Sequence, residues 1–108
     1  MKEELSSEII KDVVLTELKQ FPDERGTLLH MLRNDDPTFT TFGECYFSEV
    51  LPGAVKAWKL HLEQTQHFCV PVGRIKLVIY DNRKDSVSNS NVQLINLGRP
   101  DSYFRVMI

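Results

Sequence analysis

The chain has 108 residues, with 13 basic and 15 acidic side chains and a formal net charge of −2 at pH 7. This length suits one domain with a single core, and the charge gives no electrostatic reason to expect binding to nucleic acid or an anionic membrane. Hydrophobic residues make up 42% of the chain, without an apolar run near the roughly 20 residues of a membrane span. The N-terminus also lacks the apolar segment of a signal peptide, so we expect a cytoplasmic protein.

The N-terminal part alternates short β patterns with turns. Residues 1–11 are charged and weakly periodic, and we interpret them as a short helix, a tail or an arm exchanged with another subunit. Apolar and polar residues alternate over 12–19, which predicts a strand. The proline and glycine of residues 21–26 predict a turn. Residues 27–33 predict a second strand, and 38–43 a loop with two aromatic anchors.

The C-terminal part continues the same pattern. Residues 44–51 are rich in β-forming residues, and strands are also expected over 74–81, 92–97 and 103–108. A polar loop, which we expect to be mobile, covers 82–91. With two strands between the glycines described below, about eight short strands and no long helix predict an all-β sandwich or barrel.

Residues 53–73 contain the polar side chains around which the predicted site is arranged. In two neighbouring antiparallel strands, Lys59 and His61 would share one face and Gln66 would lie on the matching face of the next strand. The spacing resembles the first motif of the cupins, G-x5-H-x-H-x4-E-x6-G, whose positions hold Gly53, Lys59, His61, Gln66 and Gly73. A protonated lysine has no lone pair to give a metal, and a neutral glutamine is a weak ligand. The residues therefore predict a cupin frame without a metal site.

Two further segments make the resemblance more specific. Residues 21–26, Phe-Pro-Asp-Glu-Arg-Gly, are similar to an F-x-D-x-R-G turn, and residues 81–86, Asp-Asn-Arg-Lys-Asp-Ser, are similar to a D-x-R-x-D-S strand end. In the same order along the chain, these segments resemble the dTDP-4-dehydrorhamnose 3,5-epimerase branch of the cupins and its sugar 3,4-ketoisomerase relatives. The likeness covers residues 21–86. It implies one cupin-type double-stranded β-helix, or jelly-roll barrel, over 1–108.

The chain departs from the family pattern at two places. The family's R-G-x-H reads Lys-Ala-Trp-Lys over residues 56–59, so lysine replaces the catalytic histidine of the epimerases. The family's second motif, P-P-G-x-x-H-G-F, and its catalytic tyrosine would follow where this chain stops. We therefore expect a barrel that is incomplete at its C-terminal end and has an exposed strand edge.

The resemblance implies an epimerase or ketoisomerase acting on a nucleotide-linked 4-keto-6-deoxyhexose, as in dTDP-rhamnose biosynthesis, without metal or cofactor. This chemistry needs a base for the α-proton, a donor for the enolate oxygen and an acid on the opposite face. A histidine suits proton transfer near neutrality, so His61 is the candidate base. Lys59 would hold the enolate oxygen, or act as the base itself if desolvated. Both residues would otherwise be polar groups at a barrel mouth.

Four residues are candidates for substrate binding. Arg25 and Lys56 match positions that the resemblance implies for the diphosphate, although each would equally suit a surface cation. Gln66 would bond a sugar hydroxyl or fix His61. Tyr46 would act as an acid or a stacking surface, although strand tyrosines more often serve packing.

Two other functions stay open: a catalytically degenerate cupin that binds a sugar nucleotide or serves as a structural protein, and a metal-dependent cupin with altered ligands. The resemblance further implies a homodimer in which the N-terminal segment reaches the partner subunit. We expect Cys45 and Cys69 to be buried thiols rather than a disulfide, and Asp81 and Arg83 to form a structural pair. His30 and His67 are expected to be structural.

Overall fold

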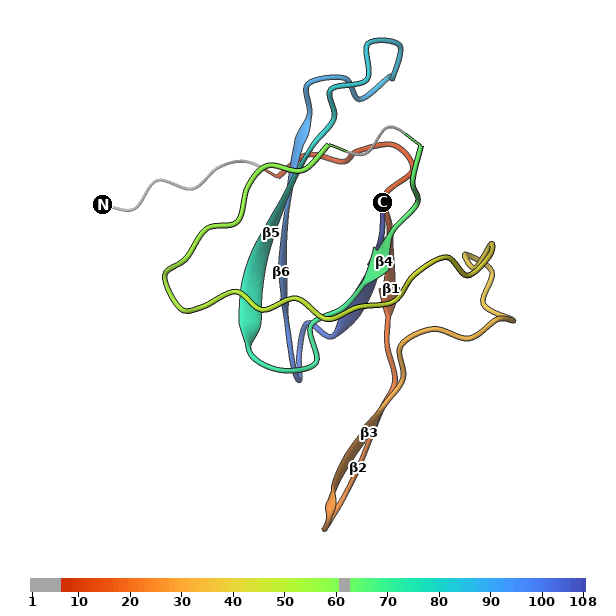
Figure 1. Ribbon diagram of the computed structural model, residues 1–108, viewed down its shortest axis with the longest axis vertical. Coiled ribbons are helices and arrows are strands. Elements are labelled where there is room, and N and C mark those ends of the chain that lie inside the picture. The colour runs from red at the N-terminus through yellow and green to blue at the C-terminus, as the bar shows by residue number, and fades with distance from the viewer. Residues whose placement is uncertain (1–6, 61–62) are drawn as a thin grey trace.

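The computed structural model describes residues 7–60 and 63–108, and all its regular elements within them are β-strands (Figure 1). In chain order they are β1 (Val14–Glu17), β2 (Gln20–Asp23), β3 (Gly26–Leu29), β4 (His67–Phe68), β5 (Arg74–Tyr80), β6 (Val92–Gly98) and β7 (Phe104–Met107). They form a three-stranded sheet in the order β1-β7-β4 and two hairpins, β2-β3 and β5-β6. The all-β class predicted from the sequence is confirmed.

Strand β7 is the centre of the three-stranded sheet. It pairs antiparallel with β1, where Leu15 lies opposite Val106, and with β4, where Phe68 lies opposite the same valine. Strand side chains alternate between faces, so Phe104 and Val106 point to one side of β7 while Arg105 points to the other. Phe104 and Val106 belong to the hydrophobic core, which places Arg105 on the outer face of this sheet.

The second layer is the β5-β6 hairpin. Ile75 lies opposite Leu97 and Leu77 opposite Ile95, so the apolar faces of the two strands coincide. Gly73, with φ of +80°, makes the turn into β5. Residues 7–10 lie along β6 of the same chain, where the Glu8 amide donates to the Val92 carbonyl at 2.8 Å.

The core fills the space between these two layers. Five buried residues form it, and half-buried apolar residues from both layers pack around them: Ile10, Ile79, Ile95, Leu97 and Val106, with Val13, Phe68, Val70, Ile75, Leu77 and Phe104. Burying such side chains supplies about 1.5–3 kcal/mol each. Two layers closing on one core is the arrangement expected of a jelly roll.

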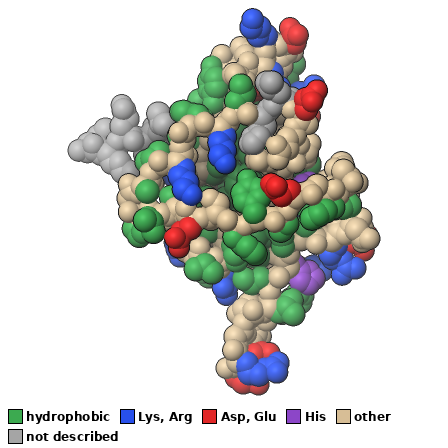
Figure 2. Space-filling model, viewed as in Figure 1, with side chains coloured by type: hydrophobic (Ala, Val, Ile, Leu, Met, Phe, Trp, Pro, Cys, Tyr) green, Lys and Arg blue, Asp and Glu red, His purple; other side chains and the backbone are tan. Residues whose placement is uncertain are grey.

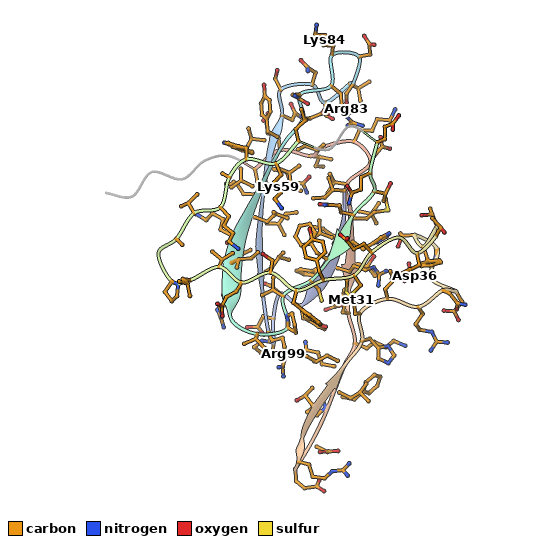
Figure 3. All side chains as sticks on the ribbon, viewed as in Figure 1. Met31, Asp36, Lys59, Arg83, Lys84 and Arg99 are labelled. Carbon is orange, nitrogen blue, oxygen red and sulfur yellow. The ribbon has the colours of Figure 1, made fainter. Side chains whose placement is uncertain are left out.

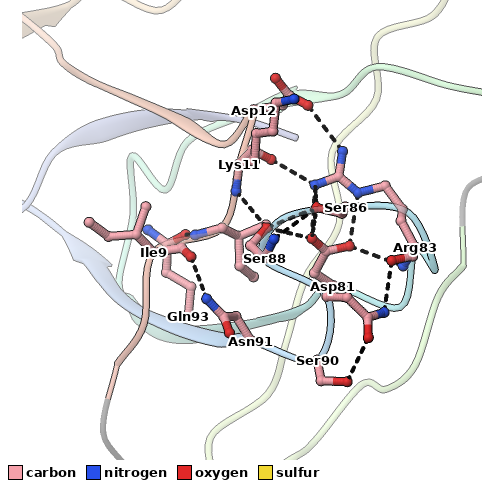
Figure 4. Close-up of polar contacts among 12 residues, drawn as sticks. Ile9, Lys11, Asp12, Asp81, Arg83, Ser86, Ser88, Ser90, Asn91 and Gln93 are labelled. Carbon is pink, nitrogen blue, oxygen red and sulfur yellow. Dashed lines mark hydrogen bonds and ion pairs between the residues drawn. The ribbon is translucent and has the colours of Figure 1, made fainter.

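A polar network orders the loop after β5 (Figure 4). The carboxylate of Asp81 accepts hydrogen bonds from Arg83 Nε at 2.8 Å, Ser86 Oγ at 2.7 Å and Ser88 Oγ at 2.6 Å. Arg83 first, and the two serines next, hold the pKa of this buried carboxyl far below its usual range. Arg83 also bonds Asp12 at 3.0 Å, which ties the loop to the N-terminal segment. The predicted Asp81–Arg83 pair is confirmed, and this network holds in place a loop that the sequence predicted to be mobile.

The molecule is less compact than a typical globular domain of its length. Its radius of gyration, 15.2 Å, exceeds the about 13 Å of a compact chain of this length. Large apolar side chains are exposed along residues 42–60, and Figure 2 shows apolar surface spread over this view of the molecule. The β2-β3 hairpin projects from the body (Figure 1).

The predicted strands differ in outcome. Those over 12–19, 74–81, 92–97 and 103–108 are confirmed as β1, β5, β6 and β7. The predicted turn over 21–26 is instead most of a hairpin, with β2 and β3 separated by Glu24 and Arg25. The strand predicted over 27–33 ends at Leu29 because the segment that follows turns to cover the outer face of β7.

Truncation of a core residue should lower stability much more than truncation of an exposed apolar residue. Leu97 is 2% exposed and Leu28 is 60% exposed. Leu97→Ala should lower the free energy of unfolding by about 2–5 kcal/mol through lost burial and a cavity. Leu28→Ala, the matched control, should change it by less than about 0.5 kcal/mol. Urea unfolding followed by circular dichroism measures both, and equal losses would contradict the core described here.

Candidate functional site

Residues 40–60 contain three of the predicted site residues and form a wide loop without regular structure (Figure 1). Among the described residues, the only backbone hydrogen bond that this segment makes runs from Ala54 to Leu51. The strand predicted over 44–51 is therefore wrong for this structure, and so is the described part, up to residue 60, of the first strand predicted between Gly53 and Gly73. A strand needs a neighbour for its backbone groups, and β-forming residues cannot create one where no neighbouring backbone lies alongside.

The predicted site residues on this loop are all exposed. Lys59 is exposed and lies beside the β5-β6 hairpin in the view of Figure 3. Lys56 donates to Ser48 Oγ at 3.2 Å, and Tyr46 is 59% exposed. His61, the predicted base, lies outside the described residues. The roles given to these side chains stay predictions.

Gln66 and Arg25 occupy different parts of the fold. Gln66 is half-buried just before β4, and its backbone exchanges two hydrogen bonds of 3.0 Å with Ile108. Arg25 lies at the tip of the projecting hairpin and pairs with Asp23 at 2.9 Å. This pairing lowers the pKa of Asp23. The structure therefore places Arg25 on a different element from Lys56 and Lys59, and its charge is already balanced by a carboxylate.

A buried polar cluster on the outer face of the three-stranded sheet was not predicted. Arg105 is 3% exposed, and its guanidinium donates to the Met31 carbonyl and to the Asp36 carboxylate. Hydrogen bonds from Thr38 chiefly, with help from Arg105, lower the pKa of Asp36 to about 2. Met31 and Asp36 lie on the same side of the molecule as β4 (Figure 3). The signal in the sequence was an arginine in the middle of an apolar strand, which needs a buried partner.

The Tyr103 hydroxyl and the Cys69 thiol extend this cluster. Tyr103 donates its hydroxyl proton to the His30 carbonyl at 2.8 Å and lies 3.7 Å from the Cys69 sulfur. Burial raises the pKa of Tyr103 to about 12, and it also raises the pKa of the Cys69 thiol. Both cysteines are free thiols, as predicted, but Cys45 is exposed rather than buried because it lies on the unpaired loop.

His30 and His67, which the sequence predicted to be structural, lie in different surroundings. The His30 ring lies 5.2 Å from the ring of Phe21, which fits a structural role. His67 is half-buried on β4, and its Nδ1 has no hydrogen-bond partner among the residues that the structure describes. Burial first, and the charge of Arg105 next, lower the pKa of His67.

Within the described ranges, no group of three or more His, Cys, Asp or Glu residues is placed to hold a metal ion. In the same ranges, no helix is long and apolar enough to span a membrane. The prediction that activity needs no metal or cofactor stays a prediction.

Comparison with known proteins gives the class of the chain. No protein-family model matches it. It is 52% identical to the dTDP sugar isomerase of Desulfovibrio desulfuricans G20, whose crystal structure superposes with a TM-score of 0.89 over 92% of this chain and 63% of that one. The fold is therefore that of a cupin, as the sequence predicted.

Two curated proteins are similar along most of the chain. It is 38% identical over 91 residues to the probable low-salt glycan biosynthesis epimerase Agl13 of Haloferax volcanii, covering 82% of this chain and 58% of that protein. It is 29% identical over 90 residues to the spore coat polysaccharide biosynthesis protein SpsL of Bacillus subtilis, covering 83% and 60%. The chain thus spans about three fifths of the length of these relatives. The matches confirm the resemblance to the dTDP-4-dehydrorhamnose 3,5-epimerase-like cupins.

The depressed pKa of His67 predicts a pH dependence of stability. The unfolded chain binds a proton near the ordinary histidine pKa of 6.5, whereas the folded chain resists it. Stability is therefore fully present above pH 6.5 and falls as the pH drops through the lowered folded value. Replacement by an amide that cannot titrate, His67→Gln, should remove this loss.

Urea unfolding midpoints at pH 7.5 and pH 5 measure the effect. Both pH values lie above the range where carboxylates such as Asp36 titrate. His30→Gln is the matched control and should keep the pH dependence of the parent protein. An unchanged pH dependence in His67→Gln would show that the group responsible lies elsewhere.

Proposed function

We propose that this protein acts on a nucleotide-linked 4-keto-6-deoxyhexose, such as a dTDP-linked sugar of rhamnose biosynthesis, as an epimerase or ketoisomerase in the cytoplasm. The observation that carries the proposal is the 52% identity to a dTDP sugar isomerase at a TM-score of 0.89. The name of the Haloferax relative, an epimerase of glycan biosynthesis, supports the same reaction class.

The proposed reaction is proton transfer next to the 4-keto group. A base removes the proton from C3 or C5, and the electrons of that C–H bond move onto the C4 oxygen to give an enolate. Return of a proton from the opposite face inverts the carbon. In this proposal His61 is the base and the Lys59 ammonium stabilises the enolate oxygen. Lys56 and Arg25 bind the diphosphate, while Gln66 and Tyr46 contact the sugar.

One observation favours a second function, a member that binds the sugar nucleotide without turnover. Lys59, Lys56 and Tyr46 are exposed on an unpaired loop, where no other described residue covers them to exclude water from a reacting carbon. Lysine also stands at the position of the family's catalytic histidine. Catalysis by this chain therefore requires that the loop be covered when substrate binds.

Deuterium incorporation distinguishes the two functions. Proton NMR of a dTDP-4-keto-6-deoxyhexose with the protein in deuterated water should show enzyme-dependent exchange at C3 or C5. His61→Asn and Lys59→Ala should each lower the exchange rate about 100-fold or more, whereas Lys84→Ala, an exposed lysine on the 81–91 loop, should not. A 3-keto product would identify the ketoisomerase reaction. A folded protein that binds the sugar nucleotide without exchange would overturn catalysis in favour of binding.

We also propose a homodimer in which the N-terminal segment reaches the partner. In the structure residues 7–10 lie along β6 of their own chain, so exchange would transfer the same pairing to the other subunit. The exposed apolar side chains of the 42–60 loop, among them Phe47 at 95% and Val55 at 86%, supply surface that association would bury.

Sedimentation equilibrium should give about twice the chain mass of 12.5 kDa. Phe47→Ser with Val55→Ser should shift the equilibrium towards the monomer by removing apolar area, while Val87→Ser, equally exposed at 88% on the 81–91 loop, should not. A compact monomer at all concentrations would contradict the proposed dimer.

A further inference from the structure

A cavity of about 430 Å³ lies at one end of the β5-β6 hairpin. Its walls are mostly polar or charged, and they come from the start of β5, the end of β6 and the turn that follows: Arg74, Lys76, Asn96, Gly98, Asp101 and Ser102. Its volume is within the range of small-molecule sites. Of the residues assigned to the proposed reaction, those that the structure describes do not line it.

The pairing of the two strands places the basic side chains of this cavity together. Arg74 lies opposite Gly98 and Lys76 opposite Asn96 in the antiparallel register. Alternation puts Arg74 and Lys76 on the same face of β5, the face opposite the core residues Ile75 and Leu77. Two cations two residues apart thus share one wall, with the Asn96 amide beside them.

The turn after β6 forms the other wall. Gly98 and Ser102 exchange two backbone hydrogen bonds, of 3.0 and 2.9 Å, and this closes residues 98–102 into a tight turn. The turn contributes the Asp101 and Ser102 side chains to the cavity. A carboxylate and a hydroxyl therefore face the same space as two cations.

Gly98 makes room for Arg74. A Cβ at this position would lie 2.6 Å from Arg74 Cγ and 3.0 Å from the Gly73 carbonyl oxygen. The aliphatic stem of Arg74 therefore rests against the bare backbone of β6, and its position is defined by that contact. An arginine held by its stem loses less conformational entropy when its guanidinium binds a ligand.

The charged side chains of this cavity are not paired with other described residues, so they can bind a ligand. In the part of the chain that the structure describes, neither Arg74 nor Lys76 makes a side-chain hydrogen bond or ion pair, and neither does Asp101. A second cavity, beside Lys11 and Arg83, differs in this respect. There the Arg83 guanidinium is taken up by Asp81, Asp12 and the Lys11 carbonyl.

We propose that the cavity beside Arg74 binds a sugar phosphate. Two adjacent cations match a phosphate dianion, for which arginine offers paired donors. A bare anion would be repelled by Asp101, so the ligand must also present hydrogen-bond donors to that side. Sugar hydroxyls do so, and Asn96 and Ser102 can bond them as well. This inference is independent of the proposed function, because it uses a different surface and different residues.

Titrations at constant ionic strength, followed by amide NMR of the full chain, test the proposal. Glucose 1-phosphate should bind saturably and shift the amide signals of residues 74–76 and 96–102. Arg74→Gln with Lys76→Gln should weaken binding about tenfold or more, and Lys84→Gln, a lysine of the other cavity, should leave it unchanged. The dispersion of the amide spectrum reports whether each variant is folded.

Asp101→Asn gives a sharper test because its expected effect depends on the ligand. It should weaken glucose 1-phosphate, by replacing the strongest hydroxyl acceptor, and tighten inorganic phosphate, by removing repulsion. Opposite shifts would support the proposal. Equal affinity for inorganic phosphate and glucose 1-phosphate, signal changes confined to other residues, or full binding by the Arg74→Gln, Lys76→Gln variant would each overturn it.

Discussion

The structure depends on the pairing of β7 on both of its edges. β1 and β4 lie on opposite edges of β7, and within the described ranges this strand is the one with which each of them pairs. The same four residues then serve two environments, because Phe104 and Val106 fill the core while Arg105 anchors the 31–38 segment from the opposite face. If β7 lost its pairing with β1 and β4, the core and the buried charge of Arg105 would therefore both be exposed.

The 40–60 loop has no neighbouring strand of this kind among the described residues. Its composition is that of a strand, yet its side chains are exposed and its backbone is almost without internal hydrogen bonds. Strand propensity reflects how a residue fits a half-buried pleated surface rather than an intrinsic backbone preference. The loop is thus a segment whose sequence suits a sheet that the described chain does not complete, and the exposed Lys56 and Lys59 follow from this.

Much of the fold was predictable because it depends on local patterns. The apolar alternation of β1 and the β-forming residues of β5, β6 and β7 gave the positions of these strands within a few residues. Asp81–Arg83 was predicted as a pair two residues apart. The ion pair between Arg105 and Asp36 was not, because it joins residues 69 apart and no local pattern records that contact. The arrangement of the predicted site was equally inaccessible, since it depends on which strands acquire neighbours and not on the spacing of Lys59 and Gln66.

The exposed 40–60 loop and the cavity beside Arg74 suit different kinds of partner. The 40–60 loop offers apolar side chains and unpaired backbone groups, and only another polypeptide can satisfy both together. The cavity beside Arg74 offers fixed charges of both signs around a small volume, which suits a small molecule that carries an anion and hydroxyl groups. A polypeptide strand would leave those charges poorly paired, and a sugar phosphate would leave the apolar loop uncovered. The proposed association and the proposed sugar-phosphate binding therefore depend on different elements and are separable by substitution.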